Sequence, residues 1–143
     1  MSKPSEGTVR AVSTFVAAFG IGVATYIAIA ESGGGAPACL AGGGGCETVA
    51  ESQYADLAGI NVAVIGIVGY VLLLVTALLR GDGARMGGFA LSLAGFGFSV
   101  YLTYLELFVI EAVCQWCVIS AILMTVLFGL NAFRMLRYAG RAP

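Results

Sequence analysis

LAGINVAVIGIVGYVLLLVTALL, residues 57–79, contains no charged side chain in 23 residues. A helix needs about 20 mostly apolar residues to cross a bilayer, so this stretch alone predicts a membrane span. The same criterion, applied outward from it, predicts three further spans at residues 11–30, 86–110 and 112–133, in which Glu106 is the only charged residue. We therefore expect an all-α membrane protein, a four-transmembrane-helix bundle, that forms one domain over residues 1–143.

The composition of the whole chain agrees with a membrane location. Of its 143 residues, 59% are hydrophobic and only 10% are charged, whereas an ordinary soluble domain has about 25% charged residues. The 7 Lys and Arg residues are balanced by 8 Asp and Glu residues, so the basic excess typical of nucleic-acid binding is missing. Histidine, the commonest acid, base and metal ligand near neutral pH, does not occur. The four cysteines are the remaining reactive side chains.

The positive charges predict how the spans are oriented in a cell membrane. Short cytoplasmic segments collect Lys and Arg, and all seven basic residues lie on one side of a four-span bundle: Lys3, Arg10, Arg80, Arg85, Arg134, Arg137 and Arg141. Both termini are therefore expected in the cytoplasm, and the loop 31–56 and the turn near Glu111 on the extracytoplasmic face. A cleaved signal peptide is the alternative for residues 11–30, but its apolar core would be only about 7 to 15 residues long.

All four cysteines fall on the predicted extracytoplasmic face, an oxidising compartment that favours disulfides. Cys39 and Cys46 lie in the long loop, and Cys114 and Cys117 begin the fourth span; three connectivities are possible. A C-x-x-C pair at a helix N-terminus favours a thiolate and a redox-active disulfide. A structural staple and a zinc site are the alternatives, although so short a loop leaves little denatured-state entropy for a disulfide to remove.

The loop pair differs from the C-x-x-C pair because glycines surround it, at residues 33–35 and 42–45. Such a free backbone suits a relay cysteine that must move between partners, although a plain linker with one static disulfide is the alternative. The following stretch, Glu47 to Leu57, has apolar residues at helical spacing and Gly59 as a stop signal. We expect an amphipathic helix there that covers an apolar pocket below the cysteines.

This pattern resembles the vitamin K epoxide reductase family, specifically its prokaryotic homologues, over nearly the whole chain. The other four-helix type of quinone-linked disulfide catalyst has its two cysteine pairs in the reverse order. The residues that carry the resemblance are Cys39, Cys46, Ser52, Gly59-Ile60, Gly66, Ser99-Val100-Tyr101-Leu102 and the pair Cys114 and Cys117.

The resemblance implies a membrane enzyme that couples thiol oxidation outside the membrane to the reduction of a quinone, menaquinone or ubiquinone, within it. Cys39 would take electrons from a thioredoxin-fold partner, Cys46 would pass them to Cys114, and Cys117 would face the quinone. Ser52, Asn61, Leu102 and Glu106 are the candidate quinone-contacting residues; no metal site is expected.

Three positions need a separate interpretation. Asn61 replaces a proline common in prokaryotic members, and it could bind a quinone carbonyl or cap a helix. Ala121 replaces a tyrosine of the animal enzymes, which argues against epoxide reduction. Glu106, about 12 Å from Cys114 at 1.5 Å per residue, is a candidate proton source because carboxylates within membranes are usually functional; the alternative is a side chain that snorkels to the interface.

Many bacterial members carry a fused thioredoxin-like domain, and here we expect none. The expected partners are the lipid bilayer and a separate thioredoxin-fold, DsbA-like protein on the outer side, and the protein is expected to be a monomer. Two other functions stay open: a vitamin K quinone or epoxide reductase that uses thiols only as reductant, and a non-enzymatic membrane subunit held by two static disulfides.

Overall fold

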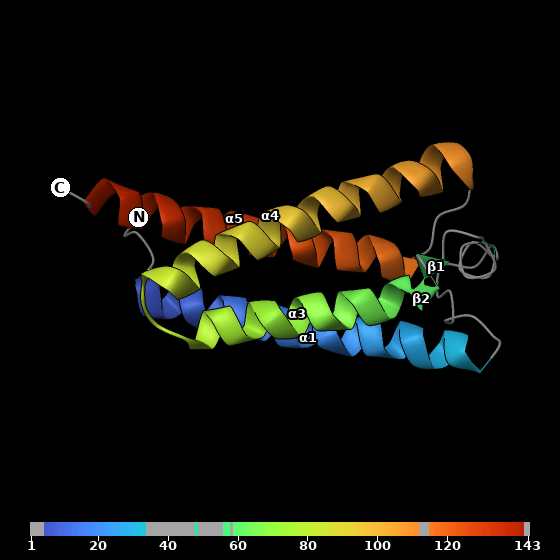
Figure 1. The fold of residues 1–143 in the computed structure, drawn as a ribbon, viewed down its shortest axis with the longest axis horizontal. Coiled ribbons are helices and arrows are strands. Elements are labelled where there is room, and N and C mark those ends of the chain that lie inside the picture. Colours follow the sequence, from blue (N-terminus) through green and yellow to red (C-terminus); the bar gives the residue numbers. More distant parts are fainter. Residues whose placement is uncertain (1–4, 34–47, 49–55, 58, 112–114, 142–143) are drawn as a thin grey trace.

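The computed structural model describes residues 5–33, 48, 56–57, 59–111 and 115–141, and four main helices dominate this part of the chain (Figure 1). A two-stranded hairpin precedes the second of these helices, and a short π-helix extends the third. In chain order the elements are α1 (Glu6–Ser32), β1 (Asp56–Leu57), β2 (Ile60–Asn61), α3 (Val62–Leu78), α4 (Asp82–Tyr104), the π-helix η2 (Leu105–Val109) and α5 (Gln115–Arg141).

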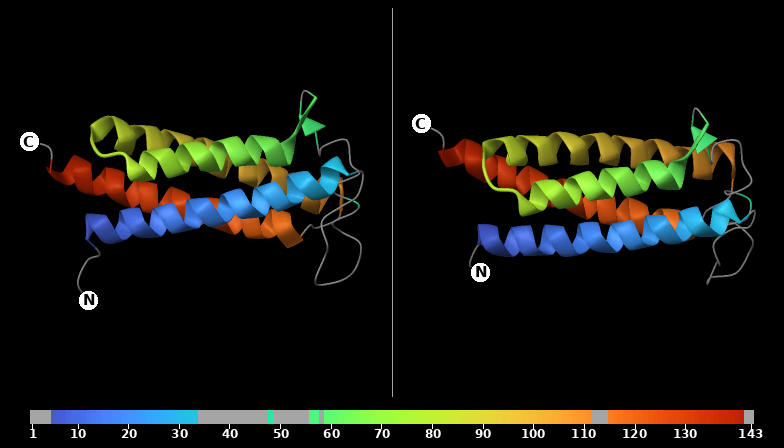
Figure 2. Two further views of the ribbon diagram at one scale, coloured as in Figure 1. Left: turned by 90° about the horizontal axis from the view of Figure 1, so that it is seen from below. Right: turned by 60° about the horizontal axis from the view of Figure 1, so that its bottom comes forward.

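The four helices form a closed bundle in which α1 contacts α3 and α5, and α4 contacts α3 and α5. Helix α1 begins and α5 ends at the end of the bundle where α3 turns into α4, as the views in Figures 1 and 2 agree. We call this the terminal end. At the opposite end α1 finishes, α3 and α5 begin, and the hairpin lies. We call this the cavity end, for the cavity described below.

Within the part of the chain that the structure describes, three helical segments are long and apolar enough to cross a membrane: Gly7–Ser32, Asp82–Val109 and Gln115–Gly140. Helix α3 is apolar too but has 17 residues, which is about 26 Å of helix against an apolar layer of about 30 Å. The expected all-α membrane protein is thus confirmed at the level of its helices. The predicted span 57–79 is wrong at its start, because the chain is still extended at Ile60 and Asn61.

The hairpin replaces the last part of the amphipathic helix that we expected over residues 47–57. Thr48 is helical and residues 49–55 lie outside the described residues, whereas Asp56 and Leu57 form strand β1. Asp56 pairs with Asn61 and Leu57 with Ile60 in antiparallel register. Gly59 has a φ of 84°, which is easy only for glycine, and this turn folds the chain back instead of continuing a helix.

Packing at the centre of the bundle depends on Gly20 of α1. A Cβ atom on Gly20 would lie inside the space of the Tyr70 ring, so glycine is what lets α3 approach α1 this closely. Tyr70 is 1% exposed, and its hydroxyl donates to the backbone oxygen of Ser120 on α5 at 2.8 Å. Tyr70 therefore connects three of the four helices.

At the terminal end, Arg10 of α1 satisfies the last turn of α3. Its Nε donates to the Ala77 oxygen at 3.1 Å, and its Nη2 donates to the Leu78 oxygen at 2.8 Å. The last carbonyls of a helix have no partner within the helix, and a cation there also favours the helix dipole. One side chain thus caps α3 and joins it to α1.

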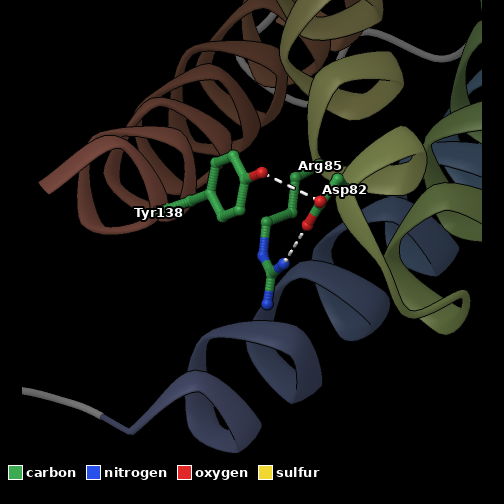
Figure 3. Close-up of polar contacts among 3 residues, drawn as sticks. All are labelled: Asp82, Arg85 and Tyr138. Atoms are coloured by element: carbon green, nitrogen blue, oxygen red, sulfur yellow. Dashed lines mark hydrogen bonds and ion pairs between the residues drawn. The ribbon is translucent and has the colours of Figure 1, made fainter. Parts of the chain in front are cut away.

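A second polar contact at the terminal end joins α4 to α5 (Figure 3). The Asp82 carboxylate accepts from Arg85 Nη1 at 3.1 Å and from the Tyr138 hydroxyl at 2.8 Å. The Arg85 guanidinium also lies 5.3 Å from the centre of the Tyr138 ring, within cation–π range. We call Asp82, Arg85 and Tyr138 the terminal clamp.

Candidate functional site

A cavity of about 360 Å³ lies between the helices at the cavity end. All four main helices and η2 contribute to its wall, which is mainly apolar. Its volume falls in the range of pockets that bind small molecules, about 300 to 1,000 Å³, and such pockets combine an apolar wall with a few polar groups. The described polar residues that line it are Glu31, Tyr70, Ser99, Thr103, Glu106, Cys117 and Ser120.

Of the four predicted site cysteines, the structure describes Cys117, which lines the cavity. It is the third residue of α5 as described and is half-buried. Backbone N–H groups in the first turn of a helix favour a thiolate over a thiol, so this position suits a reactive sulfur. Cys39, Cys46, Cys114 and Ser52 lie outside the described residues, and the predicted disulfide pairing stays a prediction.

Glu106 also lines the cavity, and only 6% of it is exposed. It is the second residue of η2, whose wider winding is seen in the Ile110 N–H donating to the Leu105 oxygen at 2.7 Å. Single π-helical turns within α-helices are frequent at functional sites. A snorkelling side chain would be exposed, so this burial argues against that alternative for Glu106 and keeps the carboxyl at the cavity.

Two more predicted positions line the cavity. Leu102 lies one helical turn before Glu106, and Ala121 lies one turn after Cys117. A position four residues along a helix shares its face, which explains why each neighbours a reactive group on the same wall.

Asn61 acts as the helix cap that the sequence analysis gave as one of its two alternatives. Its Oδ1 accepts from the Ala63 N–H at 2.8 Å, at the N-terminus of α3. Its Nδ2 donates to Glu31 Oε2 at 2.5 Å. Asn61 is not among the residues that line the cavity, whereas Glu31 is.

Sequence reasoning missed Glu31 as a site residue. It stands directly after the uncharged stretch 11–30, so it was placed at the start of a polar loop. In the structure α1 continues through Ser32, and these two further helical residues place Glu31 at the cavity. The signal that could have found it is an acidic residue at the end of a span, on the same side as the cysteines.

A comparison with family models gives a direct match. The model described as "Vitamin K epoxide reductase family" matches residues 11–132. The matched range includes every residue that lines the cavity, from Ala24 to Met124. Membership supports an oxidoreductase of the membrane with quinone-related chemistry. The chain belongs to the vitamin K epoxide reductase family.

Proposed function

We propose that the protein is a membrane thiol:quinone oxidoreductase that supports disulfide-bond formation outside the cytoplasm. The observation that carries the proposal is that Cys117 and the buried Glu106 line the same apolar cavity. A sulfur that can exchange electrons and a carboxyl that can hold a proton are the two groups such a reaction needs. Family membership supports the oxidoreductase class.

The cavity suits a quinone head group. Its apolar wall, which includes Ile27, Phe98 and Leu102, would hold a flat ring and keep water away. The ring's carbonyl oxygens need hydrogen-bond donors, and Ser120, whose hydroxyl lies 2.9 Å from that of Tyr70, lines the same cavity. When bound, a quinone supplies the chemistry of an acceptor for two electrons and two protons.

The proposed electron path uses thiol–disulfide exchange at each protein step. A reduced thioredoxin-fold partner would reduce a Cys39–Cys46 disulfide and become oxidised itself. Cys46 would then attack the Cys114–Cys117 disulfide, and the released Cys117 thiolate would be left at the cavity wall. The order of the cysteine pairs along the chain supports this path, together with the position of Cys117.

The test is turnover by the purified protein in detergent with a reduced thioredoxin-fold protein as electron donor. Menaquinone, ubiquinone and a quinone epoxide are supplied in separate reactions. We expect thiol-dependent reduction of at least one of the two quinones. Absence of turnover with all three acceptors would contradict the enzyme proposal.

A trapping experiment separates a relay enzyme from a subunit with two static disulfides. In a Cys117→Ala variant Cys114 has no C-x-x-C partner, so its thiolate should attack Cys46 of the Cys39–Cys46 disulfide and release Cys39 as a thiolate. With no Cys117 to resolve it, a Cys46–Cys114 disulfide should accumulate. Peptide mapping under non-reducing conditions would detect that bridge. A static subunit would lack one disulfide and gain no new bridge.

A quinone or quinone-epoxide reductase is the second candidate function, and the family's own description favours it. It would use the same cysteines and cavity, with thiols serving only as reductant. Ala121 on the cavity wall argues against the epoxide substrate, because the animal enzymes place a tyrosine there. Turnover of the epoxide at a rate similar to that of the quinones would reverse this preference.

A further inference from the structure

Glu31 is held at the wall of the cavity by a defined hydrogen bond. Its Oε2 accepts from Asn61 Nδ2 at 2.5 Å, and the side chain is partly buried. The other carboxyl oxygen, Oε1, makes no hydrogen bond to any residue that the structure describes. One oxygen is therefore fixed and the other is left for a ligand or a proton.

The Glu31 carboxyl is oriented by Asn61, the residue that caps the N-terminus of α3. Asn61 holds Glu31 with its amide nitrogen while its oxygen caps the N-terminus of α3. The unsatisfied N–H groups at a helix N-terminus stabilise nearby negative charge. Asp56, paired with Asn61 across the hairpin, is the other charged group at this point, and no Lys or Arg lines the cavity among the described residues.

The proposed reaction has two protons to move. A dithiol and a quinone become a disulfide and a hydroquinone, so two electrons and two protons leave the sulfur atoms and both pairs arrive on the quinone. No outside reductant or proton is needed. An apolar cavity offers few groups that can carry protons over this path. Among the described residues, the carboxyls that line it are Glu31 from α1 and Glu106 from η2.

We propose that Glu31 is a second proton-holding residue of the cavity, and that Glu31 and Glu106 each take up one of the two protons that the thiols lose as they form thiolates and release it to one quinone oxygen. This inference rests on the proposed function. Glu31 Oε1 would hold the proton, while Oε2 stays bonded to Asn61. Each carboxyl has the same protonation state before and after one turnover. The two protons lost by the thiols therefore equal the two protons gained by the quinone.

Glu31→Gln is the decisive variant because an amide keeps an oxygen for the Asn61 hydrogen bond but cannot carry the proton. One general acid or base contributes about 10²- to 10⁴-fold to a rate. Since Glu106 would remain, we expect turnover to fall by about tenfold, and the solvent hydrogen isotope effect on turnover to rise. Glu31→Asp, which restores a carboxyl, should recover part of the rate.

A binding measurement gives a readout that does not depend on activity. Trp116 is the single tryptophan of the chain and precedes Cys117, and its ring lies 4.8 Å from that of Tyr26. Quenching of its fluorescence by menaquinone should give the same affinity for wild-type and Glu31→Gln protein. A clear loss of affinity would overturn the proton role, because Glu31 would then be a binding group.

Matched controls complete the test. Glu111→Gln makes the same chemical change at an exposed carboxyl that does not line the cavity, and it should keep wild-type turnover. Asn61→Ser keeps a good helix cap but removes the amide that orients Glu31, so its turnover should fall while the helix is preserved. If Glu31→Gln turns over at the wild-type rate, this inference is wrong while the proposed function stands. If the wild-type protein itself shows no turnover, both the proposed function and this inference are wrong.

Discussion

Charged side chains have different surroundings at the two ends of the bundle. At the terminal end, Asp82 bonds both Arg85 and Tyr138, and Arg10 caps α3. At the cavity end, Glu31 and Glu106 line an apolar cavity to which no described basic residue contributes. The first arrangement joins helices, and the second leaves carboxyls that can change their charge. The polar groups that join helices thus lie at one end of the bundle, and the polar groups proposed for the reaction lie at the other.

The backbone follows the same division. The terminal end turns from α3 to α4 through Gly81, whose positive φ of 112° costs a glycine little. Near the cavity end, α4 widens into the π-helix η2, and Glu111 has a φ of 58°. For a residue other than glycine this φ is uncommon. Departures from regular structure gather at functional sites, and the π-helix here contains Glu106.

The largest effect is expected from Cys117→Ser. A hydroxyl is close in size to a thiol but cannot form a disulfide, so thiol-dependent quinone reduction should fall by on the order of 10³-fold or more. The thermal unfolding midpoint should stay near the wild-type value, because Cys117 is half-buried in the first turn of α5. Turnover and unfolding are measured on the same preparation; substantial remaining turnover would mean that the chemistry lies elsewhere.

Glu106→Gln should have the next largest effect. The amide fills the same buried space but cannot pass on a proton, and we expect turnover to fall by about 10²-fold. Steady-state kinetics with menaquinone would measure the change, and Trp116 quenching would show whether the quinone still binds. If Glu106→Gln turns over like the wild-type protein, the proton role of Glu106 is wrong.

Gly20→Val tests the packing between the two ends. The added side chain would collide with the Tyr70 ring, and overpacking of this kind costs about 1 to 3 kcal/mol. Gly22→Val is a matched control on the same helix, because a Cβ atom at Gly22 meets nothing within 4 Å. The two variants change helix propensity equally, so the difference between their unfolding free energies isolates the contact. Equal unfolding free energies would contradict the role of Gly20.

The smallest effect is expected at the terminal clamp. Asp82→Asn weakens its contacts with Arg85 and Tyr138, but the Asp82 side chain is 60% exposed, and exposed ion pairs contribute little to stability. We expect a slight decrease in the unfolding free energy, smaller than that of Gly20→Val, and unchanged turnover. A strong loss of turnover in Asp82→Asn would show that the two ends are coupled and would break the comparison.

Sequence reasoning found the helices because a long apolar segment has few other structures open to it in a bilayer. It misplaced the start of α3, because residues 57–61 contain no charged side chain and continue directly into the apolar helix. The turn at Gly59 and the cap at Asn61 are local features that hydropathy does not report. The choice between helix capping and quinone binding for Asn61 depended on its hydrogen bonds to Ala63 and Glu31, which only the structure shows.

The sequence by itself determined that this is a helical membrane protein of one family, with its cysteines and basic residues segregated along the chain. It could do so because charge and hydropathy act on each segment alone. The tertiary structure decided which groups share the cavity. Glu31 and Cys117 are 86 positions apart by their numbers (117 less 31), and they line one cavity only because α1 and α5 pack against each other. Long-range packing of this kind has no signature in either segment alone.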